Sequence, residues 1–66
     1  MYQQIITDIN AKIEQTKRKL DTYASLIENN KSSEALPDLL EYWFTHKRLL
    51  DQLISDKAML KDATKH

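Results

Sequence analysis

Apolar and small residues recur along the first part of the chain at alternating intervals of four and three positions. These residues are Tyr2, Ile6, Ile9, Ile13, Thr16, Leu20, Tyr23 and Ile27. The spacing places them on one face of an α-helix, and over nearly four heptads it is the seam pattern of a coiled coil. The pattern predicts a helix over residues 2–28 that buries one narrow face against a neighbouring helix.

A polar segment, residues 29–36, interrupts this pattern. It opens with Asn29 and Asn30. Asparagine is the common substitute for glycine at a left-handed helix end, so one of the two is predicted to cap the first helix. Pro37 suits the first turn of a new helix because no N–H donor is needed there. The segment therefore predicts a turn followed by a second helix over residues 37–62.

Two helices of nearly equal length, joined by a short polar connection, are predicted to pack as an antiparallel hairpin. At ~1.5 Å per residue each helix is roughly 40 Å long. The fold class is therefore all-α and coiled-coil-like, with one domain over residues 1–66. A core of this size seldom supplies more than ~3–5 kcal/mol, and the chain has no cysteine for a disulfide. We expect oligomerisation or a partner protein to add the missing stability.

The second helix has more apolar surface than one neighbour can cover. On a helical wheel of ~100° per residue, the apolar stripe spans about 220°, whereas packing on one helix needs little more than ~100°. The residues predicted to lie nearest to Trp43 on this wheel are Leu36, Leu39, Leu50 and Ile54. The polar residues that interrupt the stripe are His46, Lys47, Asp51 and Lys57.

The surplus is richest at three consecutive aromatic residues, Tyr42, Trp43 and Phe44. Neighbouring residues of a helix point in different directions, so at least one of the three rings must face outward. Large aromatic side chains dominate the energetics of protein interfaces. The predicted partner-binding residues are Leu39, Tyr42, Trp43, Phe44, Leu49, Leu50, Leu53 and Ile54. The alternative for Trp43 alone is that it forms the centre of the hairpin core.

Composition narrows the function classes further. Ten basic residues balance ten acidic ones, so the chain lacks the basic field of a nucleic-acid-binding protein. The absence of cysteine and glycine argues against thiol chemistry and glycine-rich phosphate loops. The two histidines, His46 and His66, have no ligand cluster around them in the sequence. We expect no enzyme activity, no metal and no cofactor. Because every apolar run is short, we also expect no membrane span.

The most distinctive segment is Leu36-Pro37-Asp38-Leu39-Leu40-Glu41-Tyr42-Trp43, followed by Lys47-Arg48-Leu49-Leu50-Asp51 and Ile54. It resembles the second helix of the YscE-type co-chaperones of bacterial type III secretion, which have nearly this length and a helix-turn-helix layout. The first helix matches that family in pattern, around Lys19-Leu20-Asp21. The chain departs from the family by lacking the turn glycines that some members have.

The resemblance implies a cytoplasmic bacterial protein that binds a tetratricopeptide-like chaperone and helps it keep a needle subunit soluble. A cytoplasmic location also fits Met1-Tyr2-Gln3-Gln4, which is no basic leader of a signal peptide. One alternative is a self-associating four-helix bundle of two hairpins, a structural or regulatory module similar to Rop or Hha. A type III needle subunit is a further alternative, although the polar segment from Lys61 to His66 lacks the apolar end that polymerisation needs.

Overall fold

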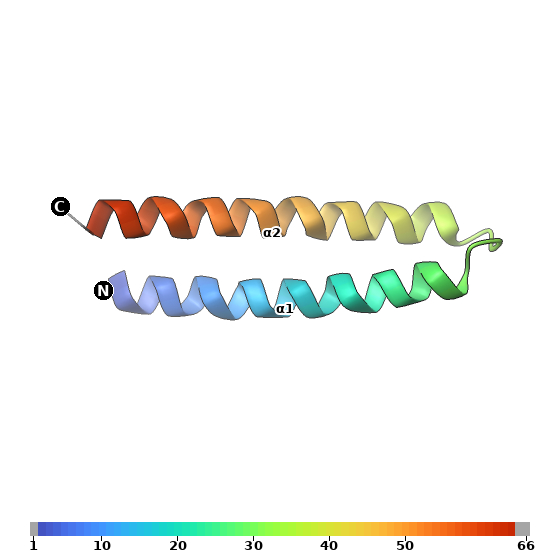
Figure 1. Cartoon of the computed structure of the whole chain (residues 1–66), viewed down its shortest axis with the longest axis horizontal. Coiled ribbons are helices and arrows are strands. Elements are labelled where there is room, and N and C mark those ends of the chain that lie inside the picture. Colours follow the sequence, from blue (N-terminus) through green and yellow to red (C-terminus); the bar gives the residue numbers. More distant parts are fainter. Residues whose placement is uncertain (1, 65–66) are drawn as a thin grey trace.

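The computed structural model describes the backbone of residues 2–64 and the side chains of residues 3–63. It contains two α-helices, α1 (Tyr2–Asn29) and α2 (Leu36–Thr64). They lie side by side and antiparallel, with their outer ends together and the turn at the far end (Figure 1), in a rod of 52 × 14 × 12 Å. The predicted all-α hairpin is confirmed. Helix α1 extends one residue beyond its predicted end, and α2 begins one residue earlier and ends two residues later than predicted.

The seam of α1 is buried as its spacing predicts. Ile13, Thr16 and Leu20 are the buried side chains of this helix. The seam residues at partly buried positions are Ile6, Ile9, Tyr23 and Ile27. The predicted seam also includes Tyr2, whose side chain lies outside the described residues. The Thr16 hydroxyl donates a hydrogen bond of 2.7 Å to the Lys12 carbonyl oxygen, so its burial leaves no polar group unpaired.

Helix α2 presents a matching seam with the same alternation of three and four positions. Its members are Leu36, Leu39, Trp43, His46, Leu50, Leu53, Lys57 and Leu60. Ile54, which the helical wheel places near Trp43, is 48% exposed and lies outside this seam. A heptad seam follows a period of about 3.5 residues rather than 3.6, a drift of ~20° per heptad. This drift moves Ile54 to the edge of the seam and brings His46 and Lys57 into it.

The hydrophobic core is small and lies halfway along the hairpin. Leu50 of α2, only 7% exposed, forms its centre with Ile13 and Leu20 of α1. Trp43 and Leu53 pack against this cluster from either side along α2. So few buried apolar side chains leave the hairpin strongly dependent on each of them.

Two contacts fix the level at which the helices pair. Near the turn, the Tyr23 ring stacks on the Tyr42 ring, with their centroids 5.7 Å apart. Near the open end, Ile9 shares a shallow groove with Asp56 and Leu60. The start of α1 therefore lies beside the end of α2, and the end of α1 lies beside the start of α2.

The turn closes without any left-handed residue. No described residue has a positive φ angle, so the expectation of a left-handed asparagine cap at Asn29 or Asn30 was wrong. The Asn30 side chain instead donates a hydrogen bond of 2.7 Å to the Leu26 carbonyl oxygen. Its backbone N–H donates to the Ile27 carbonyl at 3.1 Å. Asn30 therefore satisfies two carbonyl groups that would otherwise be unpaired at the end of α1.

This geometry gives a prediction for Asn30. Asn30→Ala should lower the free energy of unfolding by about 1 kcal/mol through loss of the side-chain hydrogen bond. Asn30→Gly should lower it by about 0.5–1 kcal/mol more, because glycine adds backbone freedom to the unfolded chain. Thermal unfolding followed by circular dichroism measures both effects. A glycine variant more stable than the wild type would show that the position is left-handed after all.

Candidate partner-binding surface

Many large apolar side chains remain exposed on the hairpin. Those of α2 are Leu40, Tyr42, Phe44, Leu49, Ile54 and Met59. Those of α1 are Ile5 and Leu26. The seam of α2 runs between its exposed apolar residues and thereby separates them, whereas Ile5 and Leu26 lie on one side of the seam of α1. The hairpin therefore has two apolar flanks rather than one.

The first flank is called here the tryptophan flank. Its exposed apolar residues are Leu40, Phe44 and Ile54, with Trp43 at its base. The Trp43 and Phe44 rings meet edge to face, with centroids 5.2 Å apart, a favourable arrangement for aromatic pairs. Trp43 is thus shared between the core and the surface, and Phe44 extends the aromatic surface outward.

A shallow groove runs between the two helices on the tryptophan flank. Its floor consists of Leu20, Ala24, Trp43 and Leu50, and the charged residues Lys17, Asp21 and Lys47 lie at its edges. The small side chain of Ala24 leaves the groove open on the α1 side. This groove combines an apolar floor with a cationic group on each helix and the carboxylate of Asp21 on α1.

Both edge lysines form ion pairs within their own helices. Lys17 lies 4.0 Å from Glu14, and Lys47 lies 3.3 Å from Asp51. All four side chains are about half exposed, and such pairs are worth at most about 1 kcal/mol. Each ammonium group can therefore turn towards an incoming carboxylate at little cost.

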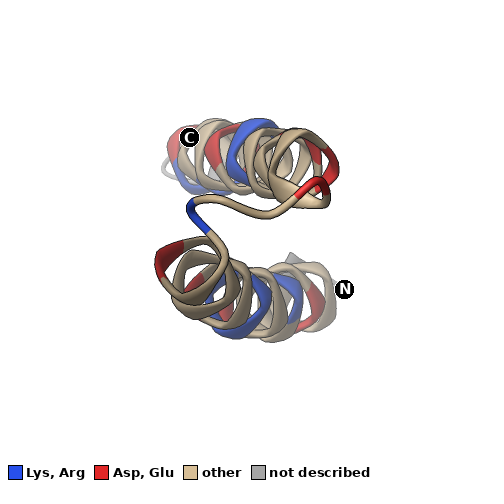
Figure 2. Cartoon of the chain, turned by 90° about the vertical axis from the view of Figure 1, so that its right-hand side faces the viewer, with Lys and Arg blue, Asp and Glu red and all other residues tan. Residues whose placement is uncertain are grey.

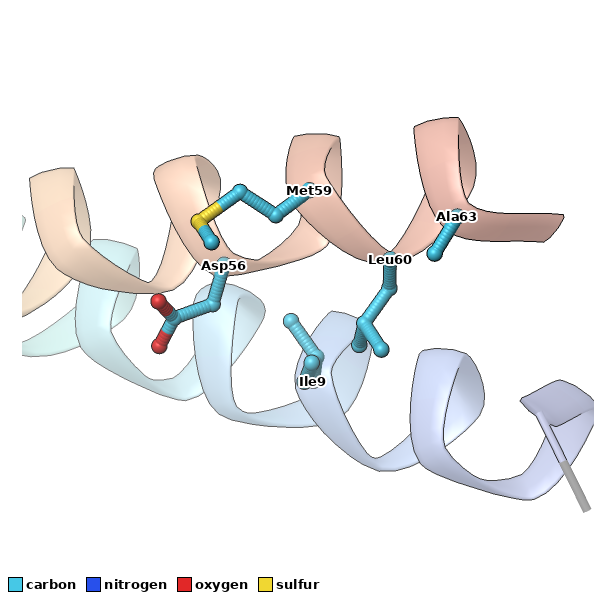
Figure 3. Close-up of a pocket in the computed structure, with 5 residues that line it drawn as sticks. All are labelled: Ile9, Asp56, Met59, Leu60 and Ala63. Carbon is cyan, nitrogen blue, oxygen red and sulfur yellow. The ribbon is translucent and has the colours of Figure 1, made fainter. Parts of the chain in front are cut away.

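The opposite flank is called here the tyrosine flank. Its exposed apolar residues are Ile5, Leu26, Tyr42, Leu49 and Met59. At the open end of the hairpin a second shallow groove is lined by Ile9, Asp56, Met59, Leu60 and Ala63 (Figure 3). Both helices contribute large apolar residues to this flank, whereas the exposed ones described on the tryptophan flank belong to α2.

The structure divides the predicted partner-binding residues into three groups. Leu50 lies in the core, and Leu39, Trp43 and Leu53 are partly buried in the seam. The exposed members are Tyr42 and Phe44, 53% and 50% exposed, together with Leu49 and Ile54. The expectation that at least one aromatic ring faces outward is confirmed for Tyr42 and Phe44. The eight residues do not form one continuous exposed face.

The sequence-based set left out four exposed apolar residues: Ile5, Leu26, Leu40 and Met59. Ile5, Leu26 and Met59 each come directly before a seam residue. An apolar residue next to a seam position widens the apolar stripe to a third position per heptad. The sequence carries this signal on both helices, at Ile5 and Leu26 of α1 and at Met59 of α2.

The area of the hairpin indicates how much surface a partner could cover. The chain exposes 5275 Å², whereas a globular monomer of this mass exposes about 4,400 Å². The excess of about 900 Å² matches the ~800 Å² that each partner contributes to a standard interface. The elongated shape of the two-helix rod accounts for this surplus of exposed surface.

Other kinds of site lack support in the described residues. Within residues 2–64, no three His, Cys, Asp or Glu side chains gather as metal ligands. Over the same part of the chain, no helix combines the length and apolarity needed to cross a bilayer. Figure 2 shows both basic and acidic residues on each of the two helices. No family model, curated protein or solved structure matches the chain.

Proposed function

We propose that this chain is a non-catalytic binding module that docks on a helical protein partner through the tryptophan flank. The observation that carries this proposal is the half-exposed Phe44 ring set against Trp43 beside an open groove. Aromatic residues at the centre of an interface contribute most of its binding energy. Burying the exposed half of the Phe44 side chain is worth about 1–1.5 kcal/mol.

The groove indicates the chemistry of the partner. An amphipathic helix could place an apolar side chain over Ala24 and pack others against Phe44 and Ile54. Acidic side chains on either side of that apolar stripe would lie near Lys17 and Lys47. The partner surface that fits best is therefore a helix with an apolar stripe and with acidic side chains near Lys17 and Lys47 but not beside Asp21.

The resemblance to YscE-type co-chaperones suggests a specific partner. In that case the helix belongs to a tetratricopeptide-like chaperone, and the complex keeps a needle subunit soluble in the bacterial cytoplasm. Helical-repeat proteins present extended surfaces of this kind to their ligands. This narrower proposal rests on the resemblance of the second helix, and the broader one rests on the flank.

The test is co-purification with the tetratricopeptide-like chaperone from the same organism, followed by size-exclusion chromatography with mass measurement. We expect a 1:1 complex that Phe44→Asp weakens at least tenfold. The matched control is Ser55→Asp, which adds the same charge to an exposed position of α2 away from both flanks. Failure of the wild-type chain to bind the chaperone would refute the co-chaperone role. A complex that tolerates Phe44→Asp would show that the tryptophan flank is not the binding surface.

A further inference from the structure

We propose that two copies of this chain pair through their tyrosine flanks, with both hairpins pointing in the same direction and both turns at the same end. The resulting four-helix bundle leaves the tryptophan flank of each copy open. The inference therefore does not depend on the proposed docking function, and each can fail without the other.

The tyrosine flank has the layout of a bundle interior. Helices in a four-helix bundle bury about three positions per heptad, the two seam positions and one neighbour. On each helix the neighbouring row consists of residues that directly precede a seam residue. On α1 this row contains Ile5 and Leu26 near its ends, and on α2 it contains Tyr42 and Leu49. Met59, which is 66% exposed, extends the apolar surface beside the groove at the open end. A second copy would cover these side chains.

The charged residues of the flank favour one relative direction. The α1 row contains Lys12 and Lys19 between its apolar ends, and the α2 row contains Asp56. A two-fold axis parallel to the rod places α1 of one copy against α2 of the other copy. These two helices are then aligned along the rod in the same way as α1 and α2 within one hairpin. Lys12 of each copy then lies level with Asp56 of the second copy, because Ile9 and Asp56 share one groove.

The opposite direction brings like charges together. A two-fold axis perpendicular to the rod lays α1 antiparallel on α1 of the second copy. The midpoint of α1 falls between Gln15 and Thr16. Lys12 and Lys19 are equally far from this midpoint, so Lys12 of each copy would face Lys19 of the other copy. Among the described residues neither lysine forms an ion pair that could offset this repulsion. Four clustered ammonium groups would destabilise that arrangement.

The first experiment measures the oligomeric state of the purified chain by sedimentation equilibrium over a range of concentrations. We expect a dimer that Leu49→Asp weakens at least tenfold, while circular dichroism shows that the variant remains helical at the concentration used. The matched control is Phe44→Asp, which places the same charge on the tryptophan flank and should leave the dimer intact. A wild-type chain that stays monomeric at high micromolar concentration overturns the proposal. A dimer sensitive to Phe44→Asp but not to Leu49→Asp assigns self-association to the tryptophan flank and also overturns it.

The second experiment measures the direction. Ser32→Cys places one thiol in the turn of a chain that has no other cysteine. Spin labels on this thiol should lie close together in a dimer whose turns share one end. In the opposite arrangement they would be separated by a distance near the 52 Å length of the rod, and that result would overturn the proposed direction. Lys12→Glu should weaken the dimer, and adding Asp56→Lys should restore it.

Discussion

Leu50→Ala should leave most of the chain unfolded at room temperature. Among the described side chains, Leu50 is the central residue of a core with three buried apolar members. Truncation of a buried leucine costs about 2–5 kcal/mol, and a hairpin of this size has about 3–5 kcal/mol in total. Urea unfolding followed by circular dichroism measures the loss of stability.

The matched control for this variant is Leu40→Ala. Leu40 is the same residue type on the same helix, but it is 38% exposed. We expect that substitution to cost less than Leu50→Ala, about 1 kcal/mol, because the Leu40 side chain is already more than a third exposed to water. Equal losses for the two variants would mean that Leu50 is not in the core. An unfolded Leu50→Ala chain that regains its helices on binding a partner would also show how closely folding and docking are linked.

Lys57→Leu should have the largest stabilising effect among single substitutions in the seam. Lys57 occupies a partly buried seam position between Leu53 and Leu60, where a coiled coil normally has an apolar residue. A leucine there would pack on α1 near Ile9 and add about 1–2 kcal/mol. The midpoint of thermal unfolding should rise by roughly 5–15 °C.

The matched control for Lys57→Leu is Arg48→Leu. This change replaces a basic residue with leucine at an exposed position of α2 outside the seam. We expect little change in the midpoint of unfolding from it. If both variants were stabilised equally, the gain would come from helix propensity or loss of charge rather than from the seam.

The division between core and surface has a consequence for function. A substitution at Leu50 or Trp43 changes the stability of the hairpin as well as its binding surfaces. Loss of binding by such a variant therefore does not identify a direct contact with the partner. Phe44 and Leu49 lie on opposite flanks and are both about half exposed. These two positions therefore report on docking and on self-association separately.

Local patterns along the chain determined the two helices, their antiparallel pairing and the seam of α1. A seam depends on the spacing of apolar residues within one helix, and this spacing can be read without knowledge of the neighbour. The surplus of apolar surface on α2 was equally visible, because one helix can cover only a limited arc of another. The sequence also showed that one of the three consecutive aromatic rings must face outward.

Only the packing of the two helices decided which residues of α2 are core and which are surface. Coiling changes the effective helical period, so Ile54 moved out of the seam while His46 and Lys57 moved into it. The same packing separated Phe44 from Tyr42 and so created two flanks from what the sequence presented as one cluster. The cap at Asn30 was also decided by the structure, because an asparagine can close a helix either by a left-handed backbone or through its side-chain amide. Each of these outcomes depends on where a side chain lies relative to a second element, which the pattern of one helix does not contain.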